Sequence, residues 1–117
     1  MKKTRRKNQM KQTTPILISE NLRQKYKDYC SFMQEITGED PEKKTRVRIY
    51  VTMRSMIAYR LSIEGSPLLH IGYVMDKEHS TIRHYINKVI DFFTYPGFDS
   101  ERELWDKFMN YKSEREA

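Results

Sequence analysis

The sequence predicts an all-α protein of about five helices, arranged as a helix-turn-helix bundle. Gly and Pro occur only four times each in 117 residues, which leaves few residues for the tight turns of a sheet. Apolar residues recur at spacings of three and four, the period of a helix that buries one face. We expect a disordered basic tail over residues 1–15 and one helical domain over residues 16–117, with an extra C-terminal helix within residues 96–117.

The first two helices have recognisable ends and apolar faces. Ser19 is a suitable N-cap for a helix that runs to Thr37, and Gly38 is a suitable residue to end it. A second helix is expected over about residues 50–63, closed by Gly65. The inward side chains are expected to be Leu22, Tyr26, Tyr29, Met33 and Ile36 in the first helix and Met53, Met56, Ile57, Tyr59 and Leu61 in the second.

A short helix, a tight turn and a longer helix follow, in the order of a helix-turn-helix motif. Ser66 and Pro67 suit the N-cap and first position of a helix that ends near Met75. Asp76 is expected in the turn and as the N-cap of the next helix, over residues 77–93. The core face of that helix is expected to be Ile82, Ile86, Val89 and Phe93.

The last helix follows the chain break at residues 95–97. Residues 100–103, Ser-Glu-Arg-Glu, are typical of a capping box, in which two side chains satisfy two backbone N–H groups. We expect its apolar residues to pack against the core. The alternative is that they form a surface for a homodimer or a protein partner. These residues are Leu104, Trp105, Phe108 and Tyr111.

The net charge of +6 is carried by the N-terminal tail. Residues 1–18 hold six basic residues and no acidic one, so the rest of the chain is neutral overall. Two basic segments on a neutral body suggest contact with a polyanion such as duplex DNA. The alternatives are a solubilising tail with a solvated helix face, or contact with acidic lipids. The second basic segment contains Lys43, Lys44, Arg46, Arg48, Arg54 and Arg60.

Several other protein classes are not expected. No apolar run reaches the roughly 20 residues that span a bilayer, and the start lacks a signal-peptide core, so a cytoplasmic location is expected. Cys30 has no second cysteine to pair with and suits a buried position on a helix. His79 and His84 are five residues apart, which puts them on different faces of a helix and does not suit a metal pair. We expect no enzymatic activity, no metal and no cofactor.

The helix after the turn has its polar residues concentrated at its start. In the DNA major groove, the first residues of a recognition helix meet the base edges. Arg83 can reach a phosphate or a guanine, and Glu78 can accept from a cytosine amino group. The alternative is an ordinary surface helix with good first-turn residues. The candidate DNA contacts in this helix are Lys77, Glu78, His79, Ser80, Thr81, Arg83, His84, Asn87 and Lys88.

The same segment resembles the DNA-binding domain of DnaA, the bacterial chromosomal replication initiator. The family pattern Arg-Asp-His-Thr-Thr-Val, then Leu-His-Ala and Lys-Ile, is followed without a gap by residues 77–82 (Lys-Glu-His-Ser-Thr-Ile), 83–85 (Arg-His-Tyr) and 88–89 (Lys-Val). The upstream pair Ile71-Gly72 resembles the family's helix before the turn. Three further arginines, Arg46, Arg48 and Arg54, keep the spacing of the family's basic loop and following helix, so the resemblance covers about residues 20–93.

The resemblance implies sequence-preferring binding of double-stranded DNA, in the regulation of replication or transcription. By position, Glu78, His79 and Ser80 would read bases in the major groove, and Thr81 would contact the backbone or a thymine methyl. Arg46 would enter the adjacent minor groove. Phosphate contacts are implied for Arg48 and Lys77.

The chain departs from the family at several points. Glu78 stands where the family has Asp, Asp76 replaces a glycine pair in a shorter turn, and Arg83 replaces an apolar residue. These changes predict a different recognition sequence. None of the four glycines precedes a lysine, so the phosphate-binding loop of an ATPase is missing, and we expect a recognition domain standing alone, nucleoid-associated when bound to DNA. The alternative function is a protein-interaction module of the same fold, within a replication complex.

Overall fold

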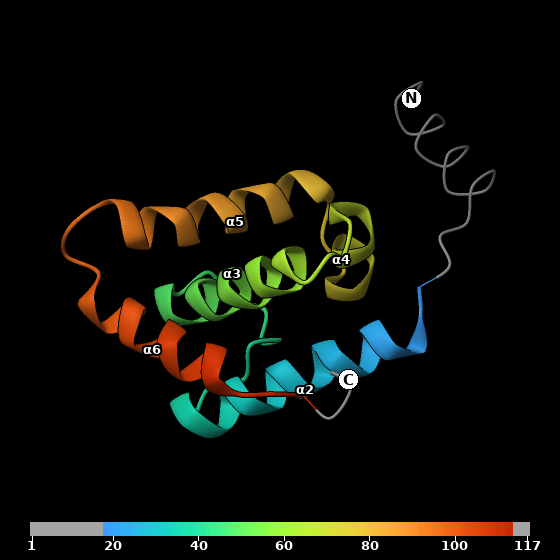
Figure 1. Ribbon diagram of the computed structural model, residues 1–117, viewed down its shortest axis with the longest axis horizontal. Helices are drawn as coiled ribbons and strands as arrows, with labels where there is room; N and C mark the ends of the chain where they lie inside the picture. Colours follow the sequence, from blue (N-terminus) through green and yellow to red (C-terminus); the bar gives the residue numbers. More distant parts are fainter. Residues whose placement is uncertain (1–17, 114–117) are drawn as a thin grey trace.

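Five helices and the turns between them make up residues 18–113, the part of the chain that this computed structural model describes. The central helix is α3, with α5 on one side and α2 and α6 on the other (Figure 1). These residues contain no strand, so the expected all-α class with five helices is confirmed. The predicted tail over residues 1–15 lies outside the described residues. The helices are α2 (Glu20–Thr37), α3 (Arg48–Ile63), α4 (Leu68–Met75), α5 (His79–Thr94) and α6 (Asp99–Asn110).

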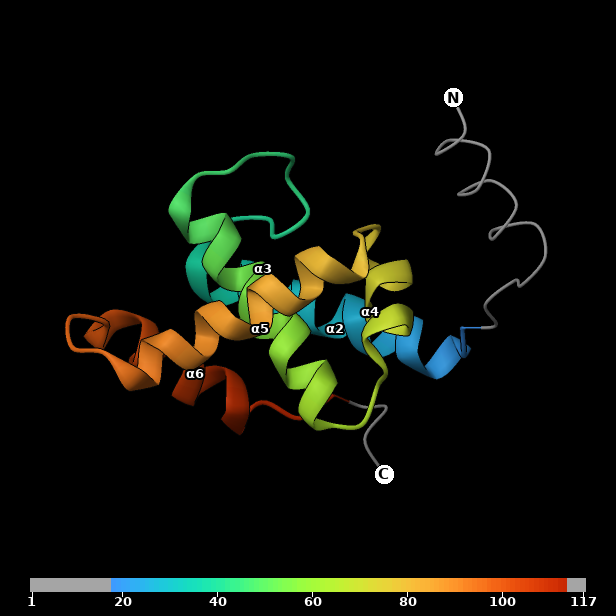
Figure 2. The same cartoon turned by 90° about the horizontal axis from the view of Figure 1, so that it is seen from above.

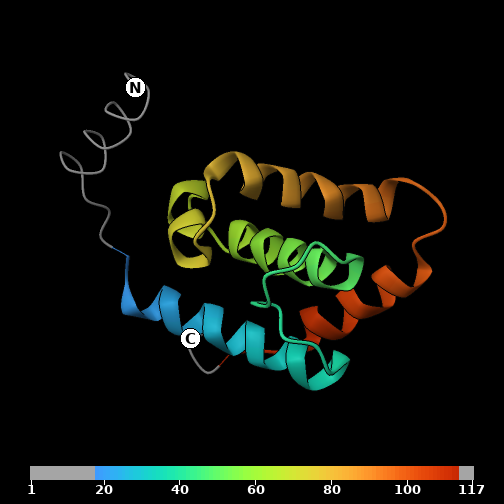
Figure 3. The same ribbon diagram turned by 180° about the vertical axis from the view of Figure 1, so that it is seen from behind.

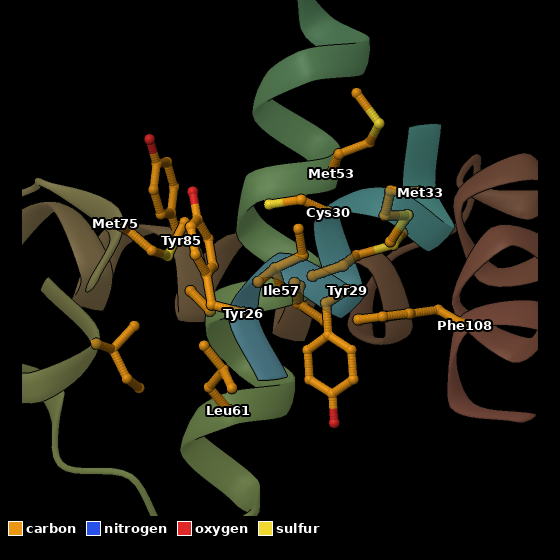
Figure 4. Close-up of a cluster of buried hydrophobic side chains, with 14 of the residues drawn as sticks. Tyr26, Tyr29, Cys30, Met33, Met53, Ile57, Leu61, Met75, Tyr85 and Phe108 are labelled. Carbon is orange, nitrogen blue, oxygen red and sulfur yellow. The ribbon is translucent and has the colours of Figure 1, made fainter. Parts of the chain in front are cut away.

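Helix α3 is buried on most of its sides because every other helix packs against it. A helix that is apolar around much of its circumference is typical of such a central position. Figure 4 shows Met53 and Ile57 of α3 among side chains from α2 and from α6, including Phe108. Cys30 of α2 is in the same buried cluster, as expected.

The ends of α2 are confirmed in detail. The Ser19 hydroxyl accepts a hydrogen bond from the Leu22 backbone N–H at 3.1 Å, so it is the predicted N-cap. Gly38 ends the helix in the left-handed conformation, at φ 79°, and its N–H donates to the Gln34 carbonyl. The predicted inward residues are buried except Ile36, which is 38 % exposed because it lies in the last turn, where a mostly exposed connection follows.

The starts of α4 and α6 differ from the prediction. Pro67 is the N-cap of α4 and not its first helical residue, so Ser66 does not cap this helix. Phe98 is the N-cap of α6, because the Arg102 N–H already donates to the Phe98 carbonyl at 2.9 Å. Ser100 therefore lies inside the first turn, where its hydroxyl contacts the Glu101 carboxylate at 3.1 Å, and the predicted capping box is wrong.

The core face of α5 is rotated relative to the prediction. Ile82 and Val89 are fully buried as expected, but Phe93 is 49 % exposed and Ile86 is half-buried. The other buried residues are Tyr85 and Phe92, which belong to this face because α5 packs against α3, α4 and α6 together. The helical period predicts one narrow stripe of buried residues along α5. Because three helices pack against α5, the buried stripe is broader and is shifted around the helix.

The aromatic residues of α6 pack inward. Phe108 is fully buried and meets Tyr29 edge-to-face at 5.1 Å between ring centroids. Tyr111 stacks on Phe32 at 4.4 Å, and Trp105 lies 5.4 Å from Tyr59. These rings therefore join α6 to α2 and α3.

Arg60 was expected in an exposed basic segment, and this expectation is wrong. Its side chain is buried, and its guanidinium donates to the carbonyls of Phe108 at 2.6 Å and Tyr111 at 2.7 Å. A third donor reaches the Glu64 carboxylate at 3.0 Å. Arg60 thus donates hydrogen bonds to carbonyl groups at the C-terminal end of α6. The last carbonyls of a helix have no hydrogen-bond partners within the helix.

Candidate nucleic-acid interface

A short turn joins α4 to α5 and sets the direction of the candidate recognition helix. Asp76 ends α4 in the left-handed conformation, at φ 58° and ψ 48°. The Lys77 N–H then donates to the Gly72 carbonyl at 2.8 Å. Glu78 is the N-cap of α5, so the predictions that Asp76 caps this helix and that Lys77 lies within it are wrong. Both residues belong to the turn because Asp76, in the left-handed conformation, breaks the helical path two residues before the N-cap of α5.

The start of α5 presents its polar side chains to solvent. Glu78, His79 and Ser80 are all exposed, as sequence reasoning expected. Residues at i and i+4 lie on one side of a helix, so Arg83 and Asn87 continue the line from His79. His84 is also exposed, while Thr81 and Lys88 are half-buried at the edge of this surface. His79, Arg83 and Asn87 therefore lie on one exposed side of α5, and Ser80 and His84 are exposed further around the helix.

The loop between α2 and α3, residues 38–47, folds back beside this turn. Seen from above, it projects from the body next to the first half of α5 (Figure 2). Seen from behind, it runs over α3 (Figure 3). The loop and the turn border an open hollow of about 170 Å³, here called the loop–turn hollow. Its lining residues are Tyr26, Pro41, Glu42, Lys43, Lys44, Arg54, Met75, Asp76 and Lys77.

Lysines from two distant parts of the sequence meet at the loop–turn hollow. Lys43 and Lys44 come from the loop and Lys77 comes from the turn. All three are exposed, and Lys43 also lies over the Tyr50 ring at 5.6 Å. The basic segment and the turn before the candidate recognition helix, which are separated in sequence, therefore line the same hollow. Lys43 and Lys44 were recognised as basic residues but not as members of this site.

Arg54 holds the loop in place from inside the protein. Its side chain is buried, with Nε donating to the Pro41 carbonyl at 2.9 Å. Its two terminal nitrogens donate to the carbonyls of Thr45, at 2.8 Å, and of Lys43. The expected direct contact of Arg54 with DNA does not fit this position, because its donors already bind the backbone. Arg54 instead shapes the loop that carries Arg46.

The remaining two arginines of the expected site are exposed. Arg46 lies near the end of the loop. Arg48 is the first residue of α3, and its guanidinium forms an ion pair with Glu101 of α6 at 2.7 Å. Sequence reasoning missed Glu101, because 53 residues separate it from Arg48 and neither helix period nor motif spacing connects the two.

The Glu101 carboxyl is held in its charged form. Its partial burial by itself would raise the pKa. Hydrogen bonds from its own backbone N–H and from the Ser100 hydroxyl, together with the Arg48 guanidinium, outweigh that effect and lower the pKa below its ordinary value. Arg48 therefore faces a permanent negative charge at neutral pH.

Other kinds of site find little support in residues 18–113. Within that range, no group of three or more His, Cys, Asp or Glu side chains is placed to hold a metal ion. No helix of the described part is long and apolar enough to cross a membrane. Burial raises the pKa of the Cys30 thiol to about 12, which leaves it protonated and unreactive at neutral pH.

Fold and surface together define a small helical protein in which a helix-turn-helix lies beside a loop whose second half, residues 43–46, is basic. Comparison with protein-family models, with curated proteins and with solved structures finds no match to this chain.

Proposed function

We propose that this chain binds double-stranded DNA with sequence preference, with α5 in the major groove and the 38–47 loop at the adjacent minor groove. The observation that carries the proposal is the meeting of Lys43, Lys44 and Lys77 at the loop–turn hollow. The three lysines outnumber the acidic residues of the hollow, Glu42 and Asp76, and the hollow lies directly before the exposed start of α5. Cations beside a helix start that is rich in hydrogen-bonding groups suit DNA, because phosphates supply affinity and base edges supply specificity.

The roles of the α5 side chains follow from their chemistry and exposure. Glu78 accepts from a cytosine amino group, and His79 and Ser80 can donate or accept at base edges. Arg83, one turn further along, reaches a guanine edge or a phosphate. The positive end of the helix dipole favours a backbone phosphate close to the same residues.

The residues on either side of these base contacts are proposed to bind phosphates and the minor groove. Lys77, at the turn, contacts the backbone at the edge of the major groove. His84, Asn87 and Lys88 lie further along α5, beside the groove wall. Arg46 is proposed for the minor groove because of its match to the DnaA arginine. The same resemblance supports a role in the regulation of replication or transcription.

The alternative, a protein-interaction module, drew its support from the aromatic residues of α6. Trp105 and Phe108 are buried against the core, and Tyr111 is stacked on Phe32. These aromatic rings therefore pack inside the protein. They favour packing of α6 against the core over a surface for a protein partner. We retain DNA binding as the proposal.

Selection of bound duplexes from a random pool tests this proposal. The full chain is incubated with the pool at a low and a moderate salt concentration, and the recovered sequences are compared. We expect one enriched motif of about one helical turn at both salt concentrations. Binding that disappears with salt and enriches no motif would reduce the chain to a non-specific polyanion binder.

A further inference from the structure

Arg48 and Glu101 join the two parts of the chain that the DnaA resemblance separates. Arg48 belongs to the part with the resemblance, and Glu101 belongs to α6, which lies beyond it. One terminal nitrogen of Arg48 lies 2.7 Å from a Glu101 oxygen. The arginine side chain is 67 % exposed, whereas that of the glutamate is 12 % exposed.

Glu101 is the fixed member of the pair. Its side chain lies in the first turn of α6, beside the Ser100 hydroxyl at 3.1 Å. Arg48 also lies 5.8 Å from the Phe98 ring, at the N-cap of the same helix. The start of α6 therefore provides both an aromatic face and a carboxylate for Arg48. Only the guanidinium is exposed enough to turn toward another anion.

We infer that Glu101 competes with a DNA phosphate for Arg48, so that α6 weakens the binding of DNA. This inference rests on the proposed function. A phosphate that approaches Arg48 must displace Glu101 or share the guanidinium with it. Sharing places two negative groups around one guanidinium, and their mutual repulsion opposes binding. The cation that the family position assigns to a phosphate is thus partly neutralised by a helix outside the family region.

Charge-removing variants test this competition. The affinity of the full chain for a 30-base-pair duplex of random sequence is measured by fluorescence anisotropy at several NaCl concentrations. Glu101→Gln keeps the shape of the side chain and removes its charge. We expect its Kd to be roughly two- to fivefold lower than that of the wild type, as for the loss of a surface ion pair. The slope of log K against log salt should steepen, by at most about 0.9 for one added phosphate contact.

Two further variants make the test specific. Glu103→Gln removes the same charge from an exposed position on α6, outside the ion pair, and should change Kd much less. In the Arg48→Ala background, Glu101→Gln should have no more effect than Glu103→Gln, because the residue for which Glu101 competes is gone. Thermal unfolding followed by circular dichroism verifies that each variant is folded.

The possible failures are distinguishable. If the wild type binds DNA but Glu101→Gln matches Glu103→Gln or binds more weakly, the competition is wrong and DNA binding stands. A gain from Glu101→Gln that persists in Arg48→Ala would also overturn it, since the gain would not act through Arg48. If the wild type binds no duplex even at low salt, the proposed function fails, and this inference fails with it.

Discussion

The α-carbon of Gly72 lies so close to the Lys77 carbonyl that a Cβ at this position would be 2.5 Å from that oxygen. The Lys77 N–H also donates to the Gly72 carbonyl at 2.8 Å. The two residues therefore close the turn between α4 and α5 through their backbones, and the carbonyl that blocks a Cβ is itself part of the turn. The direction in which α5 leaves the body depends on this contact.

Gly72→Ala should destabilise the protein and disturb this turn. The backbone must move by several tenths of an ångström to admit the methyl group, which we expect to cost about 1–3 kcal/mol. Urea unfolding measures the loss. Leu69→Ala is the control, because Leu69 is exposed on the same helix and its truncation should have a small effect. A Gly72→Ala variant more stable than the wild type by about 1 kcal/mol, the gain that alanine alone gives in a helix, would show that the turn is not closely packed.

Asp76 should tolerate glycine but not a β-branched residue. Its φ of 58° lies in the left-handed region, which costs most L-residues about 1–2 kcal/mol and costs glycine little. Asp76→Gly is therefore expected to retain or slightly raise the unfolding free energy, and Asp76→Val to lower it by about 1–2 kcal/mol. Thermal unfolding of the two variants side by side checks the order. A valine variant as stable as the glycine variant would contradict the left-handed geometry.

Arg54→Met should release the 38–47 loop. The variant loses three charge-assisted hydrogen bonds to loop carbonyls, and we expect a loss of about 2–4 kcal/mol in the unfolding free energy. Trypsin should then cleave after Lys43 and Lys44 faster than in the wild type. Arg46→Met is the matched control, since it removes an exposed arginine from the same loop. If both variants were cleaved at the same rate, Arg54 would not be what orders the loop.

The helix ends of α2 show how much local sequence determines. Ser19 and Gly38 end that helix by interactions within four residues, so the sequence was sufficient to predict them. Arg54 and Arg60 show the opposite case. Both were assigned to a basic surface, yet their partners are carbonyls that reach them only after the loop and α6 have folded. Charge alone cannot distinguish a cation that faces solvent from one that binds backbone carbonyls.

Some features of the candidate site could also be predicted from the sequence, and others could not. The polar start of α5 and its exposure were predicted, because the helical period and the position after a turn are local properties. The gathering of Lys43 and Lys44 at Lys77, and the pairing of Arg48 with Glu101, were not predicted. Each depends on how two distant segments pack, for which the sequence carries no periodic signal.

Cys30 should make the protein less stable in alkali. Burial raises the pKa of its thiol from 9.0 to about 12, so the unfolded chain releases this proton at a lower pH than the folded chain. The stabilisation is complete below pH 9 and is lost as the pH rises toward 12. Urea unfolding between pH 8 and 11 should show a decline that is smaller in Cys30→Ala. An identical decline in both proteins would assign it to other groups, such as Tyr26, whose pKa burial also raises.

If the start of α5 reads bases, as proposed, the loss of one base contact lowers the ability of the protein to distinguish two duplexes. The affinity for the selected duplex is divided by that for a scrambled duplex of equal length, in the wild type, His79→Ala, Ser80→Ala and the distant control Ser31→Ala. Losing one base contact should reduce this ratio by about five- to 150-fold in His79→Ala, equivalent to about 1–3 kcal/mol. Ser80→Ala should also reduce the ratio, while Ser31→Ala leaves it unchanged. Equal losses on both duplexes in His79→Ala would contradict the placement of α5 in the major groove.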